Sequence, residues 1–420
     1  MDSNYVLIQR FKMQVSKFSG IISKGFSKPV KKFITQMIYG IQASEDVKLS
    51  NISRSLKEDI PLIKTEDRLS RNLSYIDFSD KINYEVTRLA SNRITEDIVL
   101  AIDPGDIRKP YAKAMEHLCK IYDADKHQEG NGYHLCKVVA ASLDHMTVIP
   151  MYCQAWSTEA ESRRGVTDEI IKAIDFVSEH VGNRGTWAID RQGDNNDLIG
   201  KFIKDDKRFV IRLKLNRLVF YKDKARSVVE YSNIECPYQA TMFKYEEDSK
   251  PVTIKLQYTA INVCLATITG NFKLVIVKGF GSQPMFLLTN IPLNIHDKNQ
   301  VWQVIEIYLT RWKCDESYRY IKQSYNLEDI RVRSYIAIRN LVALVLAVAY
   351  FATVYLGKSI KLKIAVQKIL LLSKRFFGVP TFFNYAIADG ITELLRKATK
   401  GIYYSESKKQ KDFQLSFPFG

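Results

Sequence analysis

The stretch that decides the fold reads Tyr308-Leu309-Thr310-Arg311-Trp312-Lys313-Cys314-Asp315-Glu316-Ser317-Tyr318-Arg319-Tyr320-Ile321-Lys322. Within it, Tyr308, Arg311, Asp315 and Lys322 follow one another at spacings of 3, 4 and 7 residues. At about 100° per residue, these four side chains fall within roughly a 60° arc of one helix face. A carboxylate flanked by two cations and a tyrosine is an arrangement suited to holding a metal ion beside a phosphodiester.

Two aspartates upstream complete the predicted set of acids. Asp103 ends the apolar run Ile98-Val99-Leu100-Ala101-Ile102, and Asp190 ends the run Thr186-Trp187-Ala188-Ile189. Open α/β sheets place their sites at the C-terminal ends of strands, which is where both aspartates fall. Mg²⁺ prefers carboxylate oxygens from separate elements, and a pair of ions can activate a hydroxyl and stabilise a leaving oxygen. We therefore expect Asp103, Asp190 and Asp315 to bind two Mg²⁺ ions, for which Mn²⁺ can substitute.

Other acids near these positions offer alternatives. Glu316 is the alternative third acid, although it is rotated by about 100° from the face that Asp315 shares with Tyr308. Asp106 is expected to order the loop after the first strand, and Asp194 to cap a helix over 194–204. Arg191, next to Asp190, is expected either to hold a phosphate or to pair with a site carboxylate.

The composition indicates a polyanionic partner. The 420-residue chain has 62 Lys and Arg against 46 Asp and Glu, giving a net charge of +16 and a pI near 9.3. Such a surplus favours nucleic acid over a membrane surface. The six cysteines and six histidines lack metal-type spacing, which argues against a zinc site. Cysteines in apolar runs, such as Val263-Cys264-Leu265, are typical of buried reduced thiols in a cytosolic protein.

One apolar segment raises the question of a membrane. Leu341 to Leu356 is apolar except for Thr353, but it is slightly short for a membrane span. We predict a buried core helix here and no membrane partner. The rival interpretation is a membrane-surface protein that uses this helix and the basic C-terminal segment.

The local patterns predict an α/β protein with five segments. Residues 1–92 are helical and 93–213 alternate strands and helices; 214–292 are rich in Val, Tyr, Ile and Thr and predict an all-β insertion of about seven strands. Residues 293–340 carry the opening stretch on a helix expected over 298–324, and 341–420 form a basic helical region.

The short helices of the first segment suit a helix-turn-helix unit that binds DNA, with Arg68, Arg71 and Asn72 on its reading face.

Four separated motifs carry a resemblance to a known family. They are Ile102 to Lys113, Ala188 to Asp194, Tyr308 to Lys322, and Leu327 to Ser334. In this order they resemble a DDE transposase of a bacterial insertion sequence, of the subclass marked by a Tyr-x2-Arg-x3-Glu-x6-Lys signature. The resemblance implies an RNase H-like catalytic core, as in retroviral integrases, with an all-β insertion before the last acid. The family's glutamate position is Asp315 here.

The resemblance also implies a function. It is cut-and-paste DNA transposition: binding of terminal inverted repeats, metal-dependent cleavage at the element ends, and transfer of the 3′-hydroxyl into target DNA. Tyr308, Arg311 and Lys322 would contact phosphates near the cleaved end. Pairing of two ends implies a homodimer on double-stranded DNA, in a prokaryotic cytoplasm and associated with the nucleoid. The alternative is a catalytically inactive DNA-binding protein derived from such a transposase.

Overall fold

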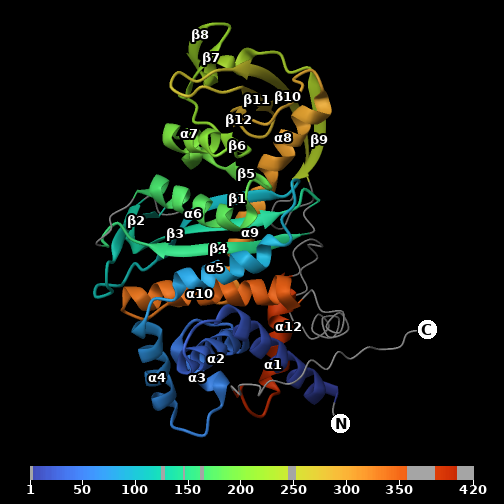
Figure 1. Cartoon of the computed structure of the whole chain (residues 1–420). Coiled ribbons are helices and arrows are strands. Elements are labelled where there is room, and N and C mark those ends of the chain that lie inside the picture. The colour runs from blue at the N-terminus through green and yellow to red at the C-terminus, as the bar shows by residue number, and fades with distance from the viewer. Residues whose placement is uncertain are drawn as a thin grey trace, which may run out of the picture.

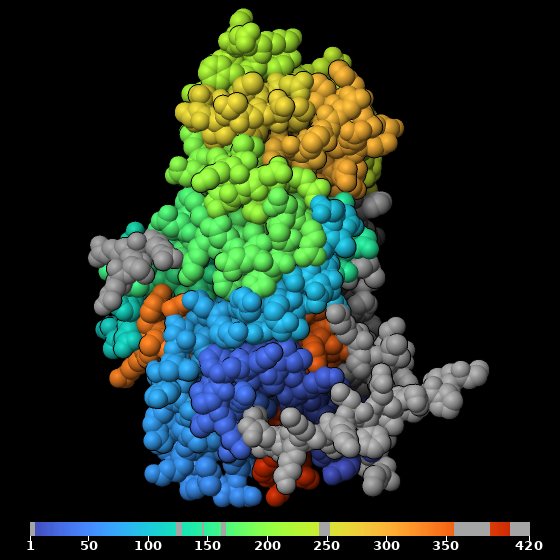
Figure 2. Space-filling model, in the orientation of Figure 1, coloured from blue at the N-terminus to red at the C-terminus, as the bar shows by residue number. Residues whose placement is uncertain are grey.

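A computed structural model describes residues 3–123, 128–144, 147–160, 165–244, 252–356 and 384–403. It contains a large mixed sheet above a layer of helices (Figure 1). The predicted α/β class is therefore confirmed in its general form. In the space-filling view, the N-terminal helices form one end of the molecule and residues of the 214–292 segment form the other (Figure 2).

The helical layer is built mainly from the N-terminal segment. Its helices are α1 (Ser3–Ile22), α2 (Lys28–Ser44), α3 (Leu49–Leu56), α4 (Leu62–Tyr75) and α5 (Ser79–Ser91). The C-terminal helix α12 (Asn384–Arg396) packs against α2. Residues 357–383 of the predicted basic helical region lie outside the described residues.

Helix α10 (Tyr335–Tyr350) is the apolar segment singled out in the sequence, and it continues in a π-helical turn, η4 (Phe351–Tyr355). Together they are long and apolar enough to cross a membrane, but 83% of the apolar window is buried inside the molecule. The helix contacts α2, α4 and α5 on one side and strand β4 (Val148–Trp156) on the other (Figure 1). Within the described structure it is a core helix that joins the helical layer to the sheet.

The central part of the sheet is formed by five strands. They are β1 (Val99–Arg108), β3 (Gln128–Ala141), β4, β5 (Thr186–Ile189) and β6 (Phe209–Arg212), in the order β4-β3-β1-β5-β6. β1, β3 and β4 pair antiparallel, whereas β5 and β6 run parallel to β1. Strand β2 (Cys119–Asp123) extends β3 at the edge. Helices α6 (Val166–Val181) and α7 (Asn196–Lys204) connect the parallel strands.

The strands of the 214–292 segment continue this sheet. β12 (Met285–Thr289) pairs antiparallel with β6, followed outward by β11 (Phe272–Lys278), β10 (Val252–Val263) and β9 (Tyr238–Lys244). Only β7 (Leu218–Tyr221) and β8 (Lys224–Ser227) form a separate hairpin within the described residues. The insertion is thus rich in strands, as the composition predicts, but most of them share one hydrogen-bonded sheet with the core.

All six cysteines are free, and Cys119, Cys136, Cys153 and Cys314 are buried. Cys264 is exposed, so the prediction of burial was wrong at that position. Val263 and Leu265 on either side of it are buried, because alternate residues of an extended segment point to opposite faces.

The helix predicted over 298–324 is divided into α8 (Lys298–Thr310) and α9 (Trp312–Ser324). The Arg311 amide donates to the Tyr308 carbonyl at 3.1 Å, and the Cys314 amide donates to the Arg311 carbonyl at 2.8 Å. These bonds span three residues rather than four, which tightens the chain locally. Arg311 keeps helical angles (φ −51°, ψ −32°), so the two helices follow one another closely. α8 packs over β5, β6 and the insertion strands, and α9 packs over β1, β3 and β4.

Candidate active site

Four charged side chains occupy corresponding positions on four adjacent strands. Asp103 on β1 is paired with Lys137 on β3. The β1–β5 register pairs Ala101 with Ala188, so two residues further along it brings Asp103 beside Asp190. The β5–β6 register pairs Ile189 with Ile211, which places Arg212 beside Asp190 in turn. Neighbouring strands lie about 4.8 Å apart. The sheet thus aligns a cation, two carboxylates and a second cation.

Asp190 ends β5 because its carboxylate caps the short 3₁₀ turn η1 (Arg191–Gly193). Its Oδ1 accepts a hydrogen bond of 2.9 Å from the amide of Gln192. Burial and then the negative charge of Asp103 raise the pKa of Asp190, opposed by the Gln192 bond and by Arg311 and Arg212. The charges of Asp103 and Asp190 therefore oppose each other, as expected for carboxylates on adjacent strands.

Helix α9 adds the third acid on the same side of the sheet. Arg311 Nη2 lies 3.2 Å from Asp315 Oδ2, and Arg311 Nη1 lies 3.6 Å from Asp103 Oδ1. Burial raises the pKa of Asp315, and Asp103 raises it further, against the effect of Arg311 and Lys137. For Arg311, burial lowers the pKa, but the net direction is upward because Asp315, Asp103, Tyr308 and Asp190 favour its charged form. Arg311 is therefore the electrostatic centre of the three predicted acids.

Glu316 is placed differently from Asp315. Its carboxylate pairs with Lys313 at 2.8 Å, on the neighbouring side of α9. The structure thus brings Asp315 to Arg311 and Asp103, and it gives Glu316 a separate partner.

Lys137 is held inside a closely fitting environment. Its ammonium donates a hydrogen bond of 2.8 Å to Asp103 Oδ2 and lies 3.5 Å from the centroid of the Tyr318 ring. A Cβ atom at Gly105 would meet this ammonium at 3.2 Å, so glycine keeps the space open. The side chain of Lys137 is only 5% exposed. Burial lowers its pKa, but Asp103 outweighs this effect and the pKa is raised overall.

An open cleft of about 600 Å³ begins at Asp315. Its lining also includes Tyr318, Arg319, Lys322, Gln323, Asn326, Glu328 and Asp329. Lys322 lies 2.6 Å from Glu328 and 3.9 Å from Asp106. The wall is fixed to β1 because the Tyr318 hydroxyl donates to the Asp106 carbonyl at 2.5 Å. The cleft therefore presents both cations and carboxylates beside the third acid.

The other predicted site residues are either buried or do not contact the three acids. Tyr308 is 1% exposed and packs in the core of the sheet, with the Arg311 guanidinium carbon 6.0 Å from its ring centroid. Arg191 is exposed at the turn after β5. Asp194 does not cap α7: it accepts a 2.8 Å bond from the amide of Lys214, and Asn195 is the cap.

The predicted DNA-reading residues lie on α4. Arg71 is exposed there, and Asn72 donates to the carbonyl of Arg68 at 2.7 Å. Arg68 pairs with Glu58 and donates to Gln36 at 2.9 Å, so its guanidinium is engaged within the helical layer. Of this group, Arg71 is the side chain best placed to meet a DNA phosphate.

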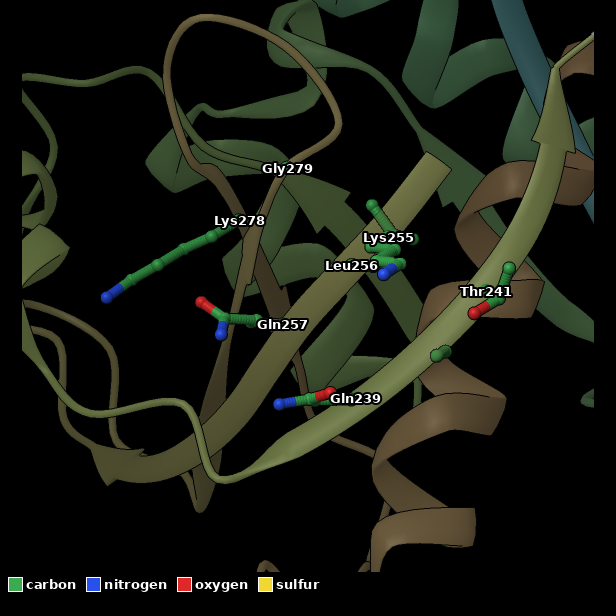
Figure 3. A pocket seen from close by; sticks show the side chains of 8 residues that line it. Gln239, Thr241, Lys255, Leu256, Gln257, Lys278 and Gly279 are labelled. Atoms are coloured by element: carbon green, nitrogen blue, oxygen red, sulfur yellow. The ribbon is translucent and has the colours of Figure 1, made fainter. Parts of the chain in front are cut away.

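A second hollow, of about 400 Å³, lies on the insertion strands. Gln239, Gln257 and Lys278 form a row across β9, β10 and β11 and project side by side (Figure 3). Its lining contains amides and lysines but no carboxylate, so this hollow offers no acidic ligand for a divalent metal ion.

The fit of a metal to the three acids is mixed. Carboxylate oxygens are the ligands that Mg²⁺ prefers. Among the described residues, however, no three His, Cys, Asp or Glu side chains form a group that could hold a metal ion. The two oxygens of Asp103 instead face Lys137 and Arg311. The carboxylate oxygens are thus suitable ligands for a divalent ion. In this structure, however, both oxygens of Asp103 are paired with cationic side chains of the protein itself.

Sequence reasoning missed Lys137, Arg212 and Tyr318. For Lys137 a signal was available, because it is a charged residue within the apolar run Leu135-Cys136-Lys137-Val138-Val139. A buried lysine needs a partner, and a partner on an adjacent strand is the simplest one. Which strand supplies it depends on register, which that run does not reveal.

No family model matches this sequence, and a search of curated proteins finds no match. Among solved structures, the chain is similar to a piggyBac transposase in a synaptic complex with hairpin DNA, determined by cryo-EM. The TM-score is 0.42 at 11% sequence identity, with 94% of this chain and 82% of that chain covered. Similarity at this level does not assign a family or a function.

Proposed function

We propose that this chain is a DNA transposase that cuts and joins phosphodiesters with the help of a divalent metal ion. The observation that supports the proposal is that Arg311 faces both Asp103 and Asp315, while the β1–β5 register brings Asp190 beside Asp103. These acids come from two strands and a helix that are far apart in sequence. Two of the carboxylates face the same guanidinium, and like charges brought this close are unfavourable unless a cation lies between them.

The central sheet supports this proposal. The order β4-β3-β1-β5-β6, with three antiparallel strands followed by two parallel ones, fits the RNase H-like core that the proposal requires. In open α/β sheets the functional site lies at the carboxyl ends of the strands. Asp190 lies at the end of β5, and the register places Asp103 beside it.

The chemistry begins with hydrolysis at the end of the element. A water oxygen forms a bond to phosphorus, the bond from phosphorus to the 3′ oxygen breaks, and that oxygen takes up a proton. A divalent ion, when bound by the carboxylates, would supply Lewis acidity for the attacking and leaving oxygens. In the second step, the freed 3′ oxygen attacks a target phosphodiester and displaces another 3′ oxygen, so bonds are exchanged without an external energy source.

The residues around the acids would position the strand. Lys322 and Arg319 line the cleft beside Asp315 and would attract a phosphate entering it. Arg311 would hold Asp315 in place through the 3.2 Å contact. The net charge of +16 would draw DNA to the surface over a longer range.

The test is nicking of a duplex that carries the inverted repeat flanking the gene. Mg²⁺ or Mn²⁺ should support nicking, and Ca²⁺ should support binding only. Asp103→Asn, Asp190→Asn and Asp315→Asn should each abolish nicking and leave binding intact. Asp197→Asn, which changes an exposed acid on α7, is the matched control and should cut normally. Equal nicking by all four variants would refute the proposal.

One observation favours a second candidate, a catalytically silent DNA-binding protein. Both oxygens of Asp103 face cations of the chain itself. In that case the duplex would be bound but not cut with any divalent ion.

A further inference from the structure

The carboxylate of Asp103 has one short contact, with the buried Lys137, and one longer contact, with Arg311. Lys137 bonds Oδ2 at 2.8 Å, whereas Arg311 approaches Oδ1 only to 3.6 Å. Arg311 also has a second carboxylate, that of Asp315, to which it donates at 3.2 Å. Arg311 can therefore leave Asp103 and keep an ion pair, whereas Lys137 has no comparable second partner among the residues that the structure describes.

The surroundings of Lys137 hold its ammonium in place. The Tyr318 ring covers it at 3.5 Å, and the backbone at Gly105 lies close on another side. Cys153, its pairing partner on β4, and Cys314 on α9 are both buried. A buried lysine that moved away from Asp103 would leave an uncompensated charge in this interior, which is strongly unfavourable.

We propose that Lys137 is a permanent counter-ion of Asp103 that takes the position of one of the two metal ions, so that the acids bind a single divalent ion. The inference rests on the proposed function, because it takes a divalent cation to be the partner of these acids. Lys137 is a positioning residue in this scheme: it fixes the Asp103 carboxylate and supplies one positive charge, and Oδ1 is the oxygen left for a metal.

The inference predicts how many ions the site can hold. The positive charge of the ammonium, 2.8 Å from Oδ2, repels a second divalent ion at that oxygen. Removing the charge should therefore open a position for one additional ion. A substitution of Lys137 that keeps the positive charge should leave the number of bound ions unchanged.

The experiment counts Mn²⁺ bound per full-length chain, without DNA, from the loss of the electron paramagnetic resonance signal of free Mn²⁺. The wild-type chain should bind one Mn²⁺ that is lost in Asp103→Asn. Lys137→Met should bind one more than wild type, and so should Lys137→Gln, which keeps a hydrogen-bond donor without the charge. Lys137→Arg should match wild type. Lys313→Met is the matched control, since Lys313 is a similarly buried lysine that pairs with Glu316 instead, and it should also match wild type.

If the wild-type chain binds two Mn²⁺ ions and Asp103→Asn loses both, the inference is overturned, whatever the lysine variants do. An unchanged count in folded Lys137→Met or Lys137→Gln would overturn it as well. Nicking of the end duplex is measured in parallel. If Lys137→Met gains one Mn²⁺ but the wild-type chain does not nick, the proposed function is rejected and the inference stands. If the wild-type chain nicks but Lys137→Met binds the same number of ions as wild type, the inference is rejected and the proposed function stands.

Discussion

Arg311 and Asp315 form an ion pair of 3.2 Å at the start of α9, where the helix predicted from the sequence divides in two. Arg311 is 7% exposed, and its guanidinium also faces Asp103 at 3.6 Å. A single buried cation thus reduces the repulsion between two carboxylates that approach from different elements.

The first prediction follows from this shared cation. Arg311→Gln should lower the free energy of unfolding by about 2 kcal/mol, because a buried charged hydrogen bond is lost and two carboxylates face each other without it. Arg311→Lys keeps the charge but not the forked geometry, and should cost about half as much. Urea unfolding near neutral pH measures both. Equal stability of all three proteins would show that the ion pair contributes nothing.

The second prediction separates the two candidate third acids. Asp315→Ala should abolish metal-dependent nicking, because its carboxylate lies with Asp103 at Arg311. Glu316→Ala should retain most of the activity and lose less than about 1 kcal/mol of stability, since its pair with Lys313 is partly exposed. Asp315→Glu should lower activity in Mg²⁺ and recover part of it in Mn²⁺, which tolerates a displaced ligand. The opposite pattern, with Glu316 essential, would mean that α9 turns by about one residue when DNA binds.

Local sequence patterns located the strands that carry the acids. The apolar runs 98–102 and 186–189 correspond to the start of β1 and to β5, and each reflects a strand buried on both faces. The predicted end of the first strand was wrong, because β1 pairs with β3 as far as Arg108. Asp103 and Asp106 therefore lie within β1, and only Asp190 follows the end of its strand. The signature helix was also placed correctly, except for its break at Arg311. Helical spacing explains the success, because it already put Arg311 and Asp315 on one face.

Long-range pairing could not be predicted in the same way. Strand composition indicated an insertion, but it did not indicate that β12 would pair with β6 and extend the core sheet. The partner of Lys137 was hidden for the same reason, since it depends on which strands pair and in which register. Tyr308 was expected at a DNA surface because its spacing from Arg311 and Asp315 gave only its position around the helix axis. The packing of α8 against the sheet buries it.

The third prediction concerns DNA binding by α4. Arg71→Ala should weaken binding of the end duplex and reduce the slope of log K against log salt by about 0.9, the effect of one lost phosphate contact. Arg68→Ala should instead destabilise the helical layer by about 1 kcal/mol, because its guanidinium is paired with Glu58. Fluorescence anisotropy across a salt series and urea unfolding distinguish the two effects. A reduced salt slope in Arg68→Ala, with unchanged stability, would restore Arg68 as a DNA contact.

The last prediction concerns Lys109, which is 8% exposed and donates to the carbonyls of Glu328 and Ile330. Burial lowers its pKa from 10.5 to about 8, although nearby acids oppose the shift. Between these two pKa values the unfolded chain binds more protons at this lysine than the folded chain does. Stability must therefore rise with pH through this window, relative to a chain that lacks the group.

Lys109→Met is such a chain. The free energy of unfolding of the wild type, minus that of the variant, should be constant below about pH 7 and should increase by roughly 1–3 kcal/mol as the pH rises from about 8 to 10. Urea unfolding at several pH values gives this difference, in which the titration of other groups cancels. A difference that stays flat would mean that Lys109 titrates normally, and a decrease would mean that its charged form is the one stabilised by Glu328 and its neighbours.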